Sequence, residues 1–177
     1  MKFTKLSIDG AWLIEPELIS DDRGIFRRHF CKDEYEELGL DSHVMQANVS
    51  ENPHLHTLRG FHYQLPPHAE GKTISCMSGS LYDIIVDLRQ DSPTYLKWEP
   101  LTIRAEDRNA LYVPPGCANA YLTMESNTIV HYYMTESYKP DAYRGFYYND
   151  PFFDFKWPFP PKLISDKDKN LPSYTPG

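Results

Sequence analysis

The chain has 177 residues, of which 41% are hydrophobic and 24% charged, and its formal net charge is −7. This length and balance fit one soluble globular domain, which we expect to span residues 1–177. The acidic charge argues against a partner such as nucleic acid or an anionic membrane, which needs a basic face, and no apolar run is long enough to cross a bilayer. We find no export signal and therefore expect a cytoplasmic protein with three reduced cysteines.

Short segments of alternating polarity predict a chain built mainly of β-strands. Fifteen prolines and 14% aromatic residues also disfavour long helices. Strands are expected over residues 10–15, 24–30, 44–50, 57–64, 73–78, 81–88, 95–103, 110–113, 120–124 and 128–134. A single short helix is expected over residues 32–38, where Gly39 ends it. This pattern is typical of an all-β jelly-roll barrel or sandwich.

Two further segments carry structural predictions. Ser-Gly-Ser at residues 78–80 separates two strongly alternating segments and predicts a tight hairpin. The tail over residues 140–177 is rich in proline but also in aromatic rings. Because a disordered tail would be poor in aromatic residues, we expect this segment to wrap over the barrel in extended form with its rings packed down.

The densest group of chemically active side chains lies in residues 58–64, Leu-Arg-Gly-Phe-His-Tyr-Gln, and is followed by Lys72. Alternation along a strand predicts that His62 and Gln64 share one face, with Arg59 on the other. A histidine and a glutamine at a barrel mouth suit proton transfer and ligand orientation. Arginine and lysine suit a phosphate. The alternative interpretation is that His62 is a hydrogen-bonded structural histidine.

The residues disfavour a metal site. His54 and His56 form a His-x-His pair, but no carboxylate follows within reach. Metal-binding cupins place a further histidine after a Pro-x-Gly turn, and here Asn119 follows the turn at residues 114–116. Two ligands rarely hold a catalytic metal, so we expect no metal. The cysteines lack a pairing motif and are expected to be buried small residues rather than nucleophiles.

The motifs and their order resemble the dTDP-4-dehydrorhamnose 3,5-epimerases, cupin-fold enzymes of nucleotide-sugar biosynthesis. The resemblance runs nearly end to end. Its pieces are Asp-Arg-Gly-Ile-Phe at 22–26, Gln-Ala-Asn-Val-Ser at 46–50, the segment 58–64 with Gly-Lys at 71–72, residues 83–94, Tyr-Val-Pro-Pro-Gly at 112–116, Trp-Pro at 157–158 and Ser-Asp-Lys-Asp at 165–168.

The resemblance implies an isomerase that deprotonates and reprotonates a nucleoside-diphospho-4-keto-6-deoxyhexose at carbon 3, carbon 5 or both. Such enzymes serve deoxysugar and cell-surface polysaccharide (O-antigen) biosynthesis and need no cofactor. The resemblance implies His62 as the base, Asp168 as its partner, Tyr132 as the proton donor on the opposite face and Lys72 as the stabiliser of the enolate. The implied substrate contacts are Gln46, Asn48, Arg59, Gln64, Tyr138 and Lys167.

The resemblance further implies a homodimer in which Arg23 and Phe26 reach into the partner's site. The chain departs from the family pattern where Arg28 and Tyr143 replace glutamates and Asn119 replaces a histidine. We predict that Arg28 and Asn119 contact the substrate and change the nucleotide or sugar preference. Arginine can only donate hydrogen bonds, and asparagine does not ionise near pH 7. A nucleotide-sugar 3,4-ketoisomerase and a non-catalytic sugar-binding cupin remain the alternatives.

Overall fold

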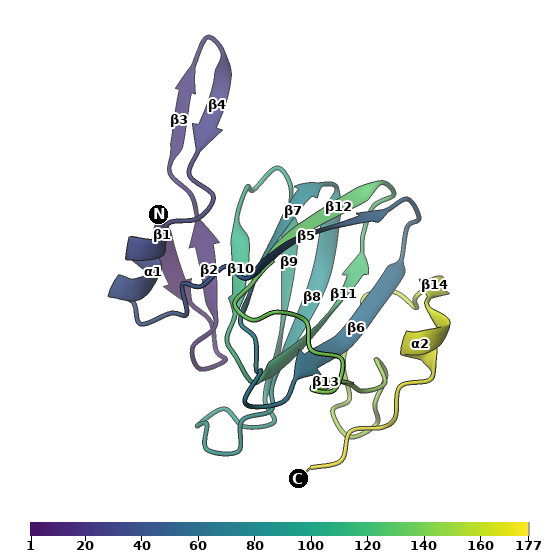
Figure 1. Cartoon of the computed structure of the whole chain (residues 1–177). Coiled ribbons are helices and arrows are strands. Elements are labelled where there is room, and N and C mark those ends of the chain that lie inside the picture. The colour runs from purple at the N-terminus through teal and green to yellow at the C-terminus, as the bar shows by residue number, and fades with distance from the viewer. Residues whose placement is uncertain (177) are drawn as a thin grey trace.

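The computed structural model describes residues 1–176 and consists of two antiparallel sheets packed face to face (Figure 1). Gly177, the last residue of the predicted domain, lies outside the described residues. The first sheet has the order β1 (Lys2–Lys5), β2 (Trp12–Glu15), β10 (Ala110–Val113), β7 (Lys72–Ser78), β12 (Thr128–Met134) and β5 (Gln46–Asn52). The second has the order β13 (Tyr143–Gly145), β6 (Thr57–Gln64), β11 (Cys117–Thr123), β8 (Ser80–Asp87) and β9 (Trp98–Arg104), and β14 (Leu163–Ile164) lies parallel to β6. This architecture confirms the predicted all-β fold.

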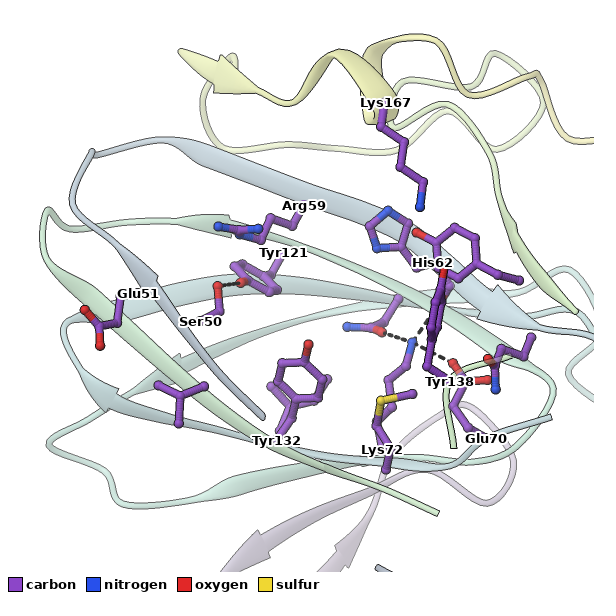
Figure 2. A pocket seen from close by; sticks show the side chains of 16 residues that line it. Ser50, Glu51, Arg59, His62, Glu70, Lys72, Tyr121, Tyr132, Tyr138 and Lys167 are labelled. Atoms are coloured by element: carbon purple, nitrogen blue, oxygen red, sulfur yellow. Dashed lines mark hydrogen bonds and ion pairs between the residues drawn. The ribbon is translucent and has the colours of Figure 1, made fainter. Parts of the chain in front are cut away.

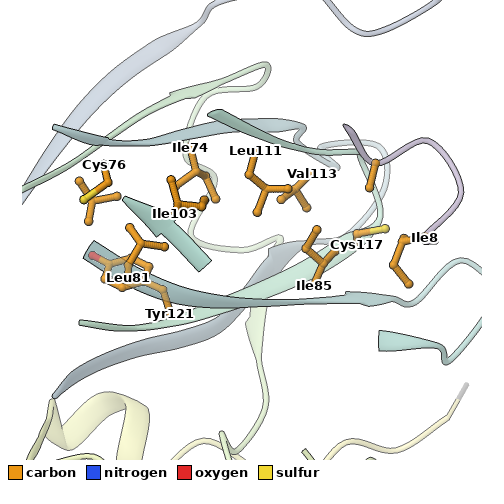
Figure 3. Packing of buried hydrophobic residues seen from close by; sticks show 12 residues of the cluster. Ile8, Ile74, Cys76, Leu81, Ile85, Ile103, Leu111, Val113, Cys117 and Tyr121 are labelled. Atoms are coloured by element: carbon orange, nitrogen blue, oxygen red, sulfur yellow. The ribbon is translucent and has the colours of Figure 1, made fainter. Parts of the chain in front are cut away.

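The main hydrophobic core lies between the two sheets (Figure 3). Ile74 and Leu111 from the first sheet meet Leu81 and Ile85 from the second. Alternation along β8 sends Leu81 and Ile85 into this core, and it sends Ile84 to the opposite face of the sheet. Each such aliphatic side chain contributes roughly 1.5–3 kcal/mol when it leaves water. The core therefore fixes the spacing of the two sheets, between which the site described below opens.

The C-terminal tail covers the outer face of the second sheet, with its rings packed down as predicted. Phe146 and Phe155 are buried, and each ring centroid lies 4.6 Å from that of Phe61. The expected extended course is interrupted by the short helix α2 (Asp166–Lys169), which docks beside β6. Four residues carry no recognisable helical period, so the sequence pattern did not reveal α2.

The predicted hairpin at Ser-Gly-Ser is wrong. β7 and β8 flank Gly79, but they belong to different sheets and do not pair with each other. Gly79 adopts a φ of 74°, and a Cβ atom there would lie 2.6 Å from Thr128 Oγ1. Glycine therefore allows a tight corner that carries the chain from one layer to the other. The predicted helix forms as α1 (Lys32–Glu37).

A separate hairpin, β3 (Leu18–Asp21) and β4 (Gly24–Arg27), projects from the sandwich (Figure 1). The sequence pattern predicted β4 but missed β3, along with the short strands β1, β13 and β14. The large apolar side chains of the hairpin are between 46% and 67% exposed, and they are Leu18, Ile19, Ile25 and Phe26. No helix within residues 1–176 is long and apolar enough to cross a membrane.

Candidate active site

A cavity of about 520 Å³ opens between the two sheets (Figure 2). Its lining comes from both sheets and from the C-terminal tail, and a volume of this size suits a small-molecule ligand. The polar and aromatic lining residues are Ser50, Glu51, Arg59, His62, Gln64, Glu70, Lys72, Asn119, Tyr121, Tyr132, Tyr138, Tyr143 and Lys167. Outside the N-terminal region, eight of the eleven residues with a predicted role line this cavity, and Gln46 and Asn48 do not. Asp168, the eleventh, stands behind His62.

The prediction that Arg59 and His62 face opposite sides of β6 is wrong, because both line this cavity. In the pairing with β11, Arg59 lies opposite Tyr121 and His62 lies opposite Asn119. Three steps along β6 therefore match two steps along β11, and this bulge resets the alternation of side chains. Gly60 lies in the bulge with a φ of 118°, where a Cβ atom would come within 2.5 Å of the facing strand.

His62 is held by a carboxylate from helix α2. Its Nε2 lies 2.8 Å from Oδ1 of Asp168, which is only 4% exposed. Burial raises the pKa of the Asp168 carboxyl, but hydrogen bonds from His62 and from the Gly60 N–H outweigh burial and hold the pKa below its ordinary value. An ionised Asp168 accepts the Nε2 proton and leaves Nδ1 as the basic nitrogen of the neutral imidazole. Nδ1 is therefore the atom of this pair that can accept a proton from a bound molecule.

Lys72 enters the cavity from the first sheet (Figure 2). Its Nζ donates to the main-chain oxygen of His62 at 2.9 Å and to Asn119 Oδ1 at 3.0 Å. It also lies 3.3 Å from Glu70 Oε1. Asn119 in turn donates from Nδ2 to Asp83 Oδ2 at 3.0 Å. A continuous row of buried polar groups thus supports one wall of the cavity.

Tyr132 supplies a hydroxyl group from the sheet opposite to the one that carries His62. Figure 2 shows this hydroxyl pointing into the cavity. Burial raises the pKa of Tyr132, although the nearby Arg59 charge acts in the other direction. The phenol is therefore protonated near neutral pH and can donate a proton. The cavity holds a base and an acid on facing walls, with an ammonium group beside them.

Two more cations, Arg59 and Lys167, make the cavity suitable for an anionic ligand. Lys167 Nζ lies 3.9 Å from the centroid of the Tyr143 ring. That ring lies 5.3 Å from the ring of His62. Tyr143, noted in the sequence only as a departure, therefore contacts the ammonium of Lys167 and lies beside the imidazole of His62.

Some residues with predicted roles lie outside the cavity lining. Gln46 accepts a hydrogen bond from the main-chain N–H of Tyr138, and Asn48 pairs in register with Tyr132. Neither Gln46 nor Asn48 is among the lining residues. Gln46 thus holds the segment that carries Tyr138, rather than facing the cavity itself.

The residues of the N-terminal region also lie away from this chain's own cavity. Arg23 pairs with Asp21 at 2.6 Å in the projecting hairpin. Arg28 donates to Glu34 Oε1 at 2.9 Å, so its guanidinium group is engaged within the same chain. Arg28 is therefore not among the residues that line this chain's own cavity, and its contact with a ligand stays a prediction.

Two buried carboxyl groups of the site, Glu70 and Asp83, were not predicted from the sequence. Asp83 lies in the predicted strand over residues 81–88. A charged residue among aliphatic ones was a usable signal there, because such a residue needs a partner when it is buried. Glu70 lies two residues before Lys72 in a segment without periodicity. Nothing in the local pattern distinguishes it from a surface glutamate.

Within residues 1–176, no three His, Cys, Asp or Glu side chains gather in a way that could hold a metal ion. His56 stacks on Phe159, with 4.6 Å between the ring centroids. Cys76 and Cys117 are buried, as predicted, and burial raises their pKa values to about 11 and about 12. Cys31 is only half-buried and precedes helix α1.

The chain is similar to known proteins over nearly its whole length. A family model described as dTDP-4-dehydrorhamnose 3,5-epimerase matches residues 5–175. An enzyme of that name from Sinorhizobium fredii is 36% identical over 174 residues, covering 98% of this chain and 89% of the relative. A dTDP-4-dehydro-6-deoxyglucose 3-epimerase from Streptomyces is 35% identical over 170 residues, covering 95% and 86%. The crystal structure of the Bacillus anthracis dTDP-4-dehydrorhamnose 3,5-epimerase with TDP and pyrophosphate has a TM-score of 0.93 and 39% identity, covering 98% of this chain and 99% of that one.

Proposed function

The chain belongs to the dTDP-4-dehydrorhamnose 3,5-epimerase family, and on this premise we propose that it epimerises a nucleoside-diphospho-4-keto-6-deoxyhexose beside its ketone. The protein is thus an isomerase that acts on a nucleotide-sugar. One observation carries the proposed mechanism. The pair of His62 and Asp168 shares a cavity with Tyr132, which stands on the facing sheet.

In the proposed reaction, His62 removes the proton from a carbon next to the ketone, and Asp168 stabilises the resulting imidazolium. The electron pair of the broken C–H bond moves onto the ketone oxygen and forms an enolate. The Lys72 ammonium stabilises that negative charge. Tyr132 then donates its phenolic proton to the same carbon from the other face, which inverts the configuration. Proton exchange with solvent restores the phenol and the neutral imidazole.

A thymidine diphosphate group is the nucleotide that we propose. Support comes from the TDP bound in the Bacillus anthracis relative and from the two cations, Arg59 and Lys167, that line the cavity here. Relatives of similar identity include a 3,5-epimerase and a 3-epimerase. The experiment in deuterated water given below counts the carbons that exchange their proton in this enzyme.

Epimerisation is favoured over a 3,4-ketoisomerase by the position of Tyr132 across the cavity from His62. Inversion at carbon needs groups on both faces of the sugar, whereas moving a ketone along the ring can proceed on one face. The preserved pair of His62 and Asp168 also disfavours a non-catalytic sugar-binding cupin. The unpaired cysteines fit the expected cytoplasmic location, where thiols stay reduced.

We also propose a homodimer in which the β3–β4 hairpin reaches the partner's cavity. Its support is the cluster of exposed apolar side chains on the hairpin, because monomers rarely expose such clusters. Phe26→Asp should shift the mass measured by light scattering from two chains to one. Leu163→Asp, at a residue that is 46% exposed outside the hairpin, should leave the dimer intact. An unchanged mass for Phe26→Asp would contradict the proposed arrangement.

The function is tested by incubating the enzyme with dTDP-4-keto-6-deoxyglucose in deuterated water and following the carbon-bound hydrogens by NMR. The wild type should exchange the hydrogen at carbon 3, carbon 5 or both. His62→Asn should keep its fold, and its rate of deuterium exchange should fall by a factor of roughly 10²–10⁴. His54→Asn, at an exposed histidine eight positions earlier in the chain, is the matched control. Near-wild-type exchange by a folded His62→Asn enzyme would overturn the assignment of the base.

A further inference from the structure

We propose that Asn119 and Asp83 form a positioning pair that holds the Lys72 ammonium at the wall of the cavity, a role that rests on the function proposed above. The sequence pointed to Asn119 as a contact for substrate. The hydrogen bonds of its side chain indicate instead that Asn119 positions a neighbouring residue, Lys72. Asp83 has no predicted role.

The amide of Asn119 is engaged on both sides. Its Oδ1 accepts from Lys72 Nζ at 3.0 Å, and its Nδ2 donates to Asp83 Oδ2 at 3.0 Å. Asn119 is 7% exposed and Asp83 is fully buried. Because an amide has distinct donor and acceptor ends, the bond to Asp83 fixes which end faces Lys72. Asp83 therefore orients Asn119, and Asn119 orients the lysine.

This connection crosses from one layer of the sandwich to the other. Lys72 is on β7 of the first sheet, whereas Asn119 and Asp83 are on the paired strands β11 and β8 of the second. A lysine has a flexible four-carbon stem, so its charge is well placed only when its N–H groups are held. The pair thus anchors a charge on a flexible stem to the sheet opposite.

The three N–H groups of Lys72 have three acceptors. They are the main-chain oxygen of His62 at 2.9 Å, Asn119 Oδ1 at 3.0 Å and Glu70 Oε1 at 3.3 Å. An ammonium group has three donors, so a substrate oxygen must replace one of these partners. The contact with Glu70 is the longest, and it is the one that the substrate oxygen replaces. The bond to Asn119 persists and keeps the ammonium in place during the reaction.

The charges of the pair suit this role. Asn119 is neutral and leaves the positive charge of Lys72 available to the substrate. Oδ1 of Asp83 has no hydrogen-bond partner among the described residues, which fits a protonated carboxyl better than a carboxylate. Burial raises the pKa of Asp83 to about 8, although the hydrogen bond from Asn119 and the charge of Lys72 act against burial. A neutral Asp83 fixes Asn119 without adding a negative charge behind the ammonium.

The test compares Asn119→Ala and Asp83→Ala with the conservative Asp83→Asn, which keeps a neutral acceptor for Asn119. Two readouts are used: kcat and KM for deuterium exchange, and the ¹H–¹⁵N NMR signal of the Lys72 ammonium without substrate. Both alanine variants should lower kcat about 10-fold to 100-fold, the effect of losing a hydrogen bond to a charged group. KM should change little. The ammonium signal should broaden in the alanine variants, and Asp83→Asn should match the wild type in both readouts.

Thr123→Val is the control for a purely structural effect. Thr123 is buried on the same strand as Asn119, and its hydroxyl donates to the main-chain oxygen of His54. This variant should lower stability without changing kcat or the Lys72 signal. If Asn119→Ala fails to fold, Asn119→Ser, whose hydroxyl is too short to bridge the two neighbours, is measured in its place.

Unchanged kcat in a folded Asn119→Ala enzyme would overturn the proposal, as would an equal loss in Thr123→Val. The NMR readout separates this proposal from the proposed function. If the wild type shows no exchange activity, the function fails, yet the response of the Lys72 ammonium to Asn119→Ala still decides whether the pair holds the lysine.

Discussion

Replacing Asp83 by asparagine should stabilise the protein, and the gain should grow as the pH rises. Asp83 is fully buried, and burial raises the pKa of its carboxyl from 3.8 to about 8. Below pH 3.8 both the folded and the unfolded chain hold this proton. Between pH 3.8 and pH 8 only the folded chain holds it, so the free energy of unfolding falls as the pH rises. Asparagine cannot ionise and removes this dependence.

The size of the effect follows from the shift. One pKa unit corresponds to about 1.4 kcal/mol, so the contribution of Asp83 should change by about 3 kcal/mol between pH 5 and pH 7. Urea denaturation of wild type and Asp83→Asn, at several pH values and one fixed protein concentration, measures the difference in the free energy of unfolding. That difference should increase steadily with pH over this interval and level off above pH 8.

Asp87, on the same strand, provides a control of opposite sign. Burial raises the pKa of Asp87, but hydrogen bonds from Arg89, Ser92 and Thr94 outweigh burial and lower the pKa to about 2. Its stabilisation is present above pH 3.8 and is lost as the pH falls towards 2. Asp87→Asn should therefore lower the free energy of unfolding by an amount that is constant between pH 5 and pH 7. A flat difference for Asp83→Asn over the same interval would refute the reasoning.

Three further outcomes are expected. Asp168→Asn should keep its fold by circular dichroism and lose roughly 10²–10⁴ in deuterium exchange, because an amide does not stabilise the imidazolium; normal exchange would contradict the role of the pair. Gly60→Ala should destabilise by several kcal/mol in urea, since its Cβ would lie 2.5 Å from the facing strand. Gly24 has a similar φ of 120° but open space around it. An equal loss of stability in Gly24→Ala would therefore show that the close contact at Gly60 is not the cause. Elemental analysis should find no stoichiometric metal, and about one metal per chain with activity lost to a chelator would disprove this.

The parts of the fold that depend on local alternation could be predicted from the sequence. The segments 57–64, 110–113 and 128–134 form strands with the predicted bounds. Alternation does not record which strand pairs with which, and so the corner at Gly79 was interpreted as a hairpin. It also assumes an unbroken register, which is why the bulge at Gly60 reversed the expected side of Arg59.

Prediction of the site residues relied more on the family resemblance than on the pattern of polar and apolar residues. The hydrogen bond between His62 and Asp168 joins residues 106 positions apart, a distance over which no periodicity carries information. The signature around His62 indicated a reactive strand by itself, whereas the role of Asp168 came only from the family motif. Tyr143 and Glu70 became part of the site only when the tail and the loop before Lys72 were placed in space.

The long separation in sequence between β6 and α2 affects the order in which the site is made. During synthesis, His62 leaves the ribosome 106 residues before Asp168. At ~5–20 residues per second, roughly 5–20 s separate the two events. For most of that interval the outer face of the second sheet, including Phe61, lacks the phenylalanine rings of the tail that later cover it. A nascent chain therefore exposes an apolar aromatic surface until residues 146–155 are made, and it has no completed acid–base pair until Asp168 is made.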